Sequence, residues 1–396
     1  MEYNFSRKLA ELKPSAIREI FKSLTDPEII SFAAGNPAPE SFPVDELAKI
    51  SADIFANNST AALQYSITEG YGPLREAVAA RQKAKFNIGT AGDSTLIVSG
   101  GQQGIELACK VFCNEGDTII CENPSFIGSL NSFRSNGINV VGVELEADGI
   151  NIRELEKALK QNPRTKLLYV IPTFQNPAGI TTSIEKRREI LRLAKKYNVV
   201  ILEDNPYGEL RFRGEDVPTL KSMDTEGRVI YCSSFSKILS AGMRVGFVIA
   251  NEQIISKMAV GKQGEDVHTN IFFQMLCHRY MTECDIDAHI EDIRSIYRHK
   301  CDLMLDCIER YVPRDIVTFT RPEGGLFIWG TVKDCDDVTP IVQRLIAKKV
   351  AVVPGSAFNC DTSKKSGSFR LNYSTPTDEQ IIEGVKRLGS VFQELK

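Results

Sequence analysis

Seven short apolar runs alternate with helical segments between residues 95 and 250, and this alternation limits the folds open to the chain. Strands rich in Val, Ile and Leu that are separated by helices are typical of a parallel sheet buried on both faces. The sequence therefore predicts an α/β fold with a mostly parallel, seven-stranded sheet in a large domain. The runs are Thr95–Ser99, Thr118–Cys121, Val140–Leu145, Lys166–Ile171, Val199–Leu202, Val229–Cys232 and Val245–Ala250.

The rest of the chain predicts a second, smaller domain. A length of 396 residues exceeds what one hydrophobic core usually holds. After Ala250 the pattern is helical to about Tyr311, and short strands then follow with two more helices. We expect a large domain over residues 43–295 and a small α+β domain over 296–396, with residues 1–42 belonging to the small one. The short strands are Ile316–Phe319, Gly325–Trp329, Val350–Val353 and Phe369–Tyr373.

A lysine stands in a polar turn between two of the predicted strands. The turn reads Ser233-Ser234-Phe235-Ser236-Lys237, and Arg244 follows seven residues after the lysine. A lysine held partly dehydrated at the mouth of a sheet has a lowered pKa and can act as a nucleophile. Hydroxyl groups and a guanidinium are what phosphate binding requires. Taken alone, the turn also fits a surface lysine among serines, so its interpretation depends on the other strand ends.

Distinctive polar residues follow other predicted strands at the same edge, where open α/β sheets bind ligands. The segment Ser99–Gly104 opens a helix and offers backbone N–H groups to an anion, although it lacks the glycine spacing of a dinucleotide fingerprint. Asn176, Asp204, Tyr207 and Phe126 each come after a further strand. Singly, these residues fit a tight turn, a helix cap or core packing.

Together, these strand ends supply a phosphate site, a lysine, a carboxylate, a phenol, an amide and a flat aromatic ring. A pyridine aldehyde phosphate cofactor requires those parts. The lysine amine bonds to the aldehyde, and the carboxylate keeps the ring nitrogen protonated so that the ring can accept electrons from a substrate carbanion.

The chain resembles the fold-type I, pyridoxal-phosphate-dependent aminotransferases of class I/II, and its pattern is similar to the 2-aminoadipate and kynurenine aminotransferase group. The resemblance covers essentially the whole chain, and the order and spacing of Lys237 and Arg244 are its most specific part. It implies pyridoxal 5'-phosphate as the cofactor and transfer of an amino group from an L-amino acid to a 2-oxo acid, such as 2-oxoglutarate, by a ping-pong mechanism. The matching segments are Gly35-Asn36-Pro37, Gln64-Tyr65-Ser66, Asn176-Pro177-Ala178-Gly179, Ser234-Phe235-Ser236-Lys237 and Phe369-Arg370-Leu371.

The resemblance also implies a role for each site residue. Lys237 would carry the cofactor covalently and shuttle a proton between substrate and cofactor, and Asp204 would pair with the ring nitrogen. Arg370 would clamp the substrate carboxylate. Tyr65 would reach the phosphate from a neighbouring subunit, which implies a homodimer with shared sites. The remaining implied contacts are Asn176 and Tyr207 at the ring hydroxyl, Phe126 stacked on the ring, Gly101, Gln102, Ser234, Ser236 and Arg244 at the phosphate, and Gly35 and Asn176 at the substrate.

The amino donor is open at this level, because aromatic, branched-chain and acidic donors share every residue named above. Ser15 and Arg18 resemble the pair that faces the distal carboxylate in aminoadipate aminotransferases, and their i, i+3 spacing puts them on one helical face. Arg18 could instead be an exposed residue paired with Glu11 or Glu19.

Two other functions have to be weighed. A lyase or decarboxylase on the same fold would use the same cofactor residues, although Arg370 favours transamination. A transcription regulator with an aminotransferase-like domain would carry a DNA-binding domain first, whereas here the aminotransferase pattern begins within about thirty residues of Met1 and no basic face precedes it.

Composition argues against several partners and sites. A formal net charge of −3 gives no reason to expect nucleic acid or a membrane as a partner. The sequence shows no signal peptide or membrane span, and its ten cysteines lack disulfide-framework spacing, so we expect the cytoplasm. The four histidines lack metal-ligand motifs, and we expect no metal.

Overall fold

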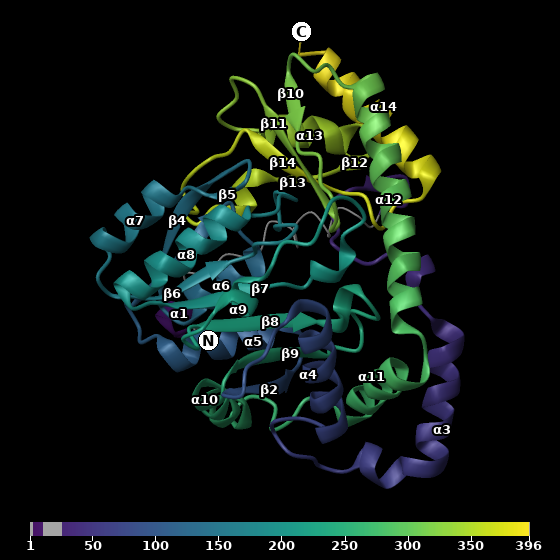
Figure 1. Ribbon diagram of the computed structural model, residues 1–396. Coiled ribbons are helices and arrows are strands. Elements are labelled where there is room, and N and C mark those ends of the chain that lie inside the picture. Colours follow the sequence, from purple (N-terminus) through teal and green to yellow (C-terminus); the bar gives the residue numbers. More distant parts are fainter. Residues whose placement is uncertain (1–2, 11–25, 396) are drawn as a thin grey trace.

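The computed structural model describes residues 3–10 and 26–395, and its largest element is a mixed sheet of eight strands (Figure 1). The order is β2-β9-β8-β7-β6-β3-β4-β5. The neighbouring strands β8, β7, β6, β3 and β4 pair in parallel. Strand β9 is antiparallel to both of its neighbours, and β5 is antiparallel to β4. The strands are β2 (Asp93–Val98), β3 (Thr118–Asn123), β4 (Asn139–Glu146), β5 (Gly149–Ile150), β6 (Thr165–Val170), β7 (Val200–Asp204), β8 (Val229–Ser234) and β9 (Gly246–Asn251).

All seven predicted strands are present in this sheet, and the predicted α/β class is confirmed. The eighth strand, β5, was not predicted because two residues are too few to show a period.

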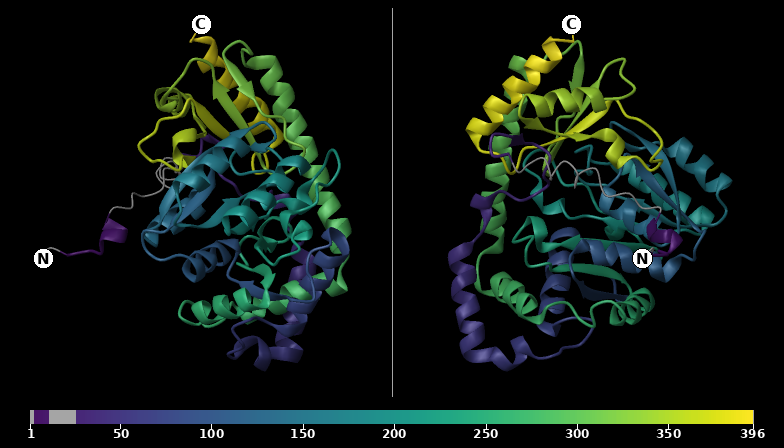
Figure 2. Two further views of the ribbon diagram at one scale, coloured as in Figure 1. Left: turned by 60° about the vertical axis from the view of Figure 1, so that its left-hand side comes forward. Right: turned by 180° about the vertical axis from the view of Figure 1, so that it is seen from behind.

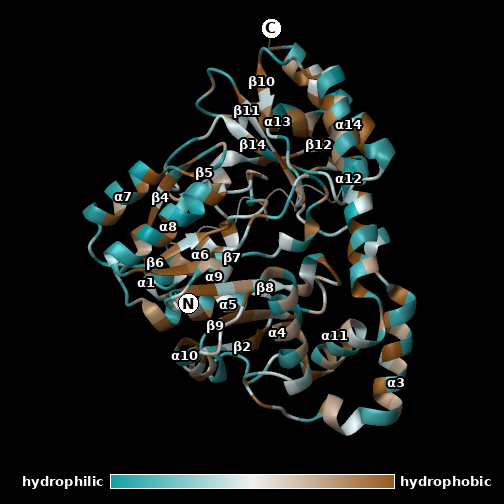
Figure 3. Ribbon diagram, viewed as in Figure 1, coloured by the Kyte–Doolittle hydropathy of each residue, from teal (hydrophilic) through white to brown (hydrophobic). Residues whose placement is uncertain are grey.

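Both faces of the sheet are buried, because successive side chains of a strand point to opposite sides. Along β6, Leu167 and Tyr169 join one hydrophobic cluster, and Leu168 and Val170 join the cluster on the other face. Figure 3 shows the central strands largely in the hydrophobic colour, with hydrophilic turns on helices such as α7 and α8. The first face is covered by α5 (Gly101–Phe112), α6 (Ile127–Ser135) and α10 (Glu252–Gln263), and the second by α4 (Gly72–Phe86), α7 (Ile152–Gln161), α8 (Ile184–Tyr197), α9 (Leu220–Met223) and α11 (Ile271–Glu283).

A smaller sheet forms above the large one in Figure 1. It has four antiparallel strands in the order β10-β11-β14-β13, and β1 pairs separately with β12. The predicted small-domain strands are therefore present, although the run at 350–353 is divided into β12 and β13. The elements are β1 (Ile30–Ser31), β10 (Val317–Phe319), β11 (Phe327–Val332), β12 (Val350–Ala351), β13 (Val353–Pro354), β14 (Ser368–Asn372), α13 (Thr339–Ala347) and α14 (Asp378–Gln393).

The long helix α12 (Ile286–Tyr311) runs from the large sheet to the small one, as the views of Figures 1 and 2 show. The predicted division between residues 295 and 296 falls inside this continuous helix, and the domain boundaries remain a prediction. Helix α3 (Val44–Leu63) bends at Asn58, which has non-helical backbone angles. Before residue 26 the structure describes residues 3–10, which include the short helix α1 (Arg7–Ala10).

One edge of the large sheet gathers the segments that the sequence singled out. The parallel strands β7 and β8 end there at Asp204 and Ser234, and the antiparallel β9 begins there at Gly246. Strand β2 also ends at this edge and leads through Gly100 into α5. The register therefore places four chain segments around one space, although they are far apart in sequence.

Candidate active site

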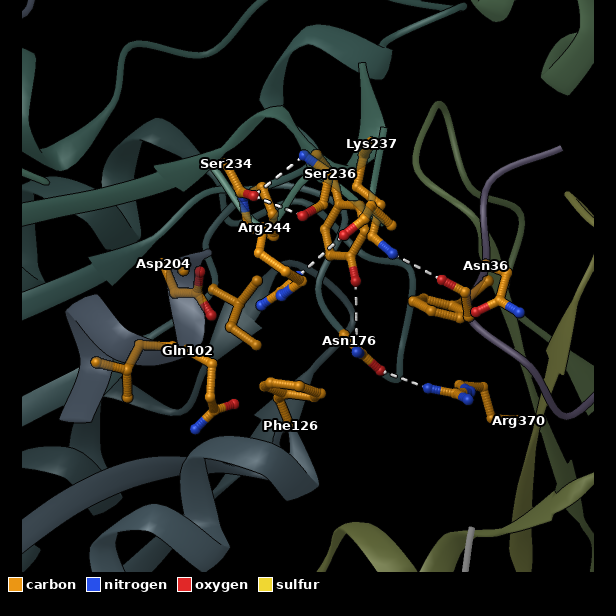
Figure 4. Close-up of a pocket in the computed structure, with 18 residues that line it drawn as sticks. Asn36, Gln102, Phe126, Asn176, Asp204, Ser234, Ser236, Lys237, Arg244 and Arg370 are labelled. Carbon is orange, nitrogen blue, oxygen red and sulfur yellow. Dashed lines mark hydrogen bonds between the residues drawn. The ribbon is translucent and has the colours of Figure 1, made fainter. Parts of the chain in front are cut away.

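A pocket of about 470 Å³ opens at this edge, between the large and small sheets. Figure 4 shows that its side chains come from both parts of the chain, with Asp204 and Gln102 on one side and Asn36 and Arg370 on the other. The lining residues are Gly35, Asn36, Gly101, Gln102, Ile105, Phe126, Ile171, Asn176, Asp204, Pro206, Tyr207, Ser234, Ser236, Lys237, Ala241, Arg244, Phe327 and Arg370.

Lys237 ends a short 3-10 turn after β8 and extends its amine into the pocket (Figure 4). Its Nζ donates a hydrogen bond of 2.7 Å to the carbonyl of Gly35. Burial, followed by the positive charges of Arg370 and Arg244, lowers the pKa of the amine to about 8. An appreciable neutral fraction therefore exists near neutral pH, as a nucleophile or base requires.

A phosphate-sized cradle lies where β8, β9 and α5 meet. The hydroxyls of Ser234 and Ser236 lie 2.7 Å apart, and Arg244 donates from Nη2 to the carbonyl of Ser99 at 3.3 Å. The first turn of α5, which contains Gly101, adds backbone N–H groups and a positive helix end.

Glycine is required at position 100 of this cradle. Its φ is +77°, and a Cβ there would lie 2.1 Å from Nη2 of Arg244. The backbone can therefore approach the guanidinium only because the side chain is missing. Gln102, which follows Gly101 in the first turn of α5, donates from its side-chain amide to the carbonyl of Gly128 at 3.1 Å.

Asp204 places a carboxylate in the pocket, and no described residue gives it a cationic partner. Tyr169 donates to its Oδ2 at 2.7 Å. Among the described residues, no other side chain forms a hydrogen bond with this carboxylate. Burial raises the pKa of Asp204 to about 6, and the hydrogen bond from Tyr169 acts in the opposite direction. A protonated ring nitrogen would supply the missing positive charge.

Asn176 and Tyr207 form a polar link across the pocket. The amide of Asn176 donates to the hydroxyl of Tyr207 at 3.4 Å, and its Oδ1 accepts from Nη1 of Arg370 at 2.9 Å. Burial raises the pKa of Tyr207, so its phenol stays protonated and can donate to a bound hydroxyl or phenolate.

Arg370 lies on β14 with its guanidinium between two aromatic rings. The guanidinium lies 4.2 Å from the ring centre of Phe327 and 4.9 Å from that of Phe358. Its Nη2 donates to the carbonyl of Ala33 at 2.7 Å, whereas its buried Nε has no partner within residues 3–10 and 26–395. Burial lowers the pKa of Arg370 to about 10. A buried cation with an unused donor is suited to bind a carboxylate.

Phe126 and Gly35 also line the pocket. Phe126 caps the start of α6 and presents its ring to the pocket (Figure 4). A Cβ at Gly35 would lie 3.1 Å from the ring of Phe327, so the glycine lets this turn pack closely.

Tyr65 does not line the pocket of this chain. Tyr65 is 82% exposed on the surface, where its ring lies edge-on to His268 at 5.9 Å. Ser15 and Arg18 lie outside the described residues.

Residues that the sequence did not single out hold two of the pocket's charged side chains in place. Phe327 and Phe358 hold Arg370, and Tyr169 holds Asp204. Tyr169 and Phe327 fall within the predicted strands Lys166–Ile171 and Gly325–Trp329, whereas Phe358 lies in no predicted element, and none of the three was assigned a role in the site.

The geometry fits pyridoxal 5'-phosphate, because each of its polar groups has a matching group in the pocket. The cradle suits the phosphate, Asp204 suits the ring nitrogen, Tyr207 suits the ring hydroxyl, and Lys237 suits the aldehyde.

Comparison with known proteins also indicates an aminotransferase that uses this cofactor. The family model for aminotransferases of class I and II matches residues 27–388. The chain is 39% identical over 397 residues to aromatic-amino-acid aminotransferase 1 of Thermococcus litoralis, covering 99% of this chain and 95% of the relative. The structure of Pyrococcus horikoshii kynurenine aminotransferase, in complex with PMP, superposes with a TM-score of 0.94 at 37% identity, covering 99% of this chain and 97% of that one. The structure of LysN, the α-aminoadipate aminotransferase of Thermus thermophilus, complexed with N-(5'-phosphopyridoxyl)-L-leucine, gives a TM-score of 0.89 at 36% identity with the same coverage.

Proposed function

The chain belongs to the family of class I and II aminotransferases, and from this premise we propose the role of each site residue, the class of amino donor and the assembly. The enzyme is a pyridoxal-phosphate-dependent aminotransferase of fold type I. One observation carries the assignment of roles: the amine of Lys237, the carboxylate of Asp204 and the guanidinium of Arg370 come from distant segments and line one pocket.

When bound, the cofactor supplies an aldehyde that bonds to amines and a ring that takes up the electron pair of a substrate carbon. Its phosphate would be held by Ser234, Ser236, Arg244, Gly101 and Gln102. Phe126 would stack on its ring, Asp204 would pair with the ring nitrogen, and Tyr207 and Asn176 would hydrogen-bond the ring hydroxyl.

The chain's own groups position the substrate and move one proton. Arg370, supported by Asn176, binds the α-carboxylate and turns the α-carbon toward Lys237. The amine of Lys237 removes the proton from the α-carbon, holds it and can release it again, because its lowered pKa lets it exist in both forms near neutral pH. Because donor and acceptor use the same pocket in turn, the kinetics are ping-pong.

Borohydride reduction tests the lysine assignment. Reduction should fix the cofactor to the peptide that contains Lys237, and a label on another lysine would contradict the assignment.

Turnover should also require a 2-oxo acid acceptor such as 2-oxoglutarate. Product formed without an acceptor would favour a lyase or a decarboxylase.

We propose a homodimer in which Tyr65 reaches the partner's cofactor. Tyr65 borders a hollow of about 590 Å³ that Phe55, Leu63 and Phe272 also line. Leu63 is 74% exposed and Phe55 is 48% exposed in the single chain. A cluster of large apolar side chains around a surface hollow is typical of a face covered by another protein surface.

Mixing inactive Lys237→Ala and Tyr65→Ala subunits should restore activity. In a hybrid dimer, one of the two sites combines the native Lys237 of one subunit with the native Tyr65 of the other. Random exchange would give about one native site in four. The control mixes Lys237→Ala with Asp204→Asn; both residues line the pocket of one chain, so no hybrid site is intact and no activity should return. Equal recovery in both mixtures, or none in either when exchange is demonstrated, would contradict a shared site.

We propose acidic and aromatic amino acids as donors, with Arg18 binding the distal carboxylate of 2-aminoadipate or glutamate. The names of the relatives support both classes. Arg18→Ala should lower kcat/KM for 2-aminoadipate more than for leucine or phenylalanine. The difference, expressed as lost transition-state stabilisation, should be about 1.5–3 kcal/mol, the range for a hydrogen bond to a charged group. Lys13→Ala, which removes the same charge from the same segment, is the control. Equal losses on acidic and apolar donors would make Arg18 a structural residue.

We also propose the cytoplasm as the location, since all ten cysteines are free. Within the described residues, no helix has the length and apolar character needed to cross a membrane.

A further inference from the structure

Two buried hydroxyl groups lead from helix α6 to Asp204. Ser129 donates from Oγ to the hydroxyl of Tyr169 at 2.8 Å, and Tyr169 donates to Oδ2 of Asp204 at 2.7 Å. Ser129 and Tyr169 are fully buried and Asp204 is 5% exposed. With Asp204 ionised, both bonds run in this direction, because an ionised carboxylate can only accept.

The sheet register creates this arrangement. Tyr169 on β6 pairs with Leu202 on β7, so Asp204 lies two residues further along β7 and points to the same face. Helix α6 covers that face, and Phe133 of α6 packs edge-on against the ring of Tyr169 at 5.4 Å. The phenol can therefore reach Asp204 but cannot rotate away from it.

We propose that Tyr169, held by Ser129, is a positioning residue that keeps Asp204 ionised and aimed into the pocket, so that the shared proton stays on the cofactor ring nitrogen. This inference rests on the proposed role of Asp204 as the partner of that nitrogen.

The electrostatics of the pocket require such a donor. Burial favours the neutral form of Asp204, and the ionisable groups that interact with it are Glu122, Tyr207, Cys232 and Tyr169. Not one of these described groups is a cation, and an ionised Glu122 would oppose a second negative charge. The hydrogen bond from Tyr169 is thus the contact that opposes burial. Burial and the charge of Asp204 raise the pKa of Tyr169 well above its usual value, so the phenol remains a donor.

The location of the proton depends on which partner is the stronger base. A carboxylate that loses its donor becomes more basic, and it then takes the proton from the ring nitrogen. The pair still holds one proton, but an unprotonated ring is a weaker electron acceptor. Tyr169 would therefore affect the chemical step more than substrate binding, for which Arg370 is responsible.

Ser129 also connects the two hydroxyl groups to Phe126, the aromatic residue that faces the pocket. Its backbone N–H donates to the carbonyl of Phe126 at 3.1 Å in the first turn of α6. The ring-stacking residue and the support of Asp204 are therefore parts of one helical turn.

The test uses holoenzyme loaded with cofactor that is nitrogen-15 labelled in the ring. The ring nitrogen chemical shift of Tyr169→Phe, Ser129→Ala and Asp204→Asn would be compared with that of the native enzyme at one neutral pH. The control is Tyr231→Phe, which removes a buried hydroxyl from β8 that accepts from Asn205 at 3.2 Å and does not contact Asp204.

We expect Tyr169→Phe to move the resonance toward that of an unprotonated ring, with the proton equilibrium shifted about tenfold to a hundredfold toward the carboxyl. Ser129→Ala should move it in the same direction by less, and kcat should fall while the KM for the amino donor changes little. Ser129→Ala preserves the test if Tyr169→Phe binds the cofactor poorly.

An unchanged resonance in both variants, with a large change in Asp204→Asn, would overturn this inference and leave the role of Asp204 intact. An equal change in Tyr231→Phe would also overturn it, because any lost hydroxyl would then have the same effect. No change in Asp204→Asn would instead refute the proposed role of Asp204.

Discussion

Replacing Lys237 with alanine should lower turnover by at least about 10⁴-fold while the protein still binds the cofactor. The amine is both the covalent attachment point and the base that moves the α-proton. The other polar side chains that line the pocket are a carboxylate, a phenol, amides, hydroxyls and two guanidiniums. The phosphate cradle of Ser234, Ser236 and Arg244 is unchanged by the substitution, so binding is retained. Equilibrium dialysis and single-turnover absorbance measure the two effects separately.

The matched control is Lys237→Arg, which keeps the positive charge but removes the ionisation to a neutral amine. It should be as inactive as the alanine variant, because a guanidinium stays protonated. In the native apoprotein, covalent attachment of the cofactor should become faster as pH rises through about 8, since the neutral amine is the nucleophile and the lowered pKa of Lys237 sets that midpoint. Turnover by Lys237→Arg near the native rate would assign the proton transfer to another group.

The sequence could predict the strand ends of the site because their chemistry is local. Lys237, Asp204, Asn176 and the turn before α5 each follow an apolar run, and parallel strands place those ends at one edge. The resemblance to a known family then assigned Arg370, which lies in the other sheet and has no local signal of its own.

The supporting residues could not be predicted, because their partners are set by register and packing between distant segments. Tyr169 reads as one more buried residue of a strand, and only the placement of β7 and α6 gives its hydroxyl two partners. Phe358 meets Arg370 because β13 and β14 pair, which no periodicity shows. The place of Tyr65 in an assembly depends on a second chain, and the contribution of Arg18 depends on a segment outside the described residues.

Asp204→Asn should lower kcat by roughly 10²- to 10⁴-fold with the fold unchanged. Asparagine keeps the size of the side chain and can still form hydrogen bonds, but the ring nitrogen loses the negative charge that keeps it protonated. The native carboxylate is ionised above its pKa, which burial raises to about 6 in the free protein. The protonated ring nitrogen of a bound cofactor would favour the charged carboxylate and lower that pKa. The acidic limb of the native pH profile should therefore lie below about 6, and it should disappear in Asp204→Asn.

Glu203→Gln separates this effect from the general cost of removing a buried carboxylate. Glu203 precedes Asp204 on β7 but accepts from the backbone N–H groups of Leu220 and Lys221 on the opposite face of the sheet. Its substitution should lower the free energy of unfolding while the turnover of each folded molecule stays normal, because it touches neither pocket nor cofactor. Asp204→Asn should show the reverse, with stability largely retained and turnover lost. If Asp204→Asn instead kept near-native turnover and the native acidic limb, another group would have to sustain the protonated ring, and the pairing of Asp204 with the ring nitrogen would be wrong.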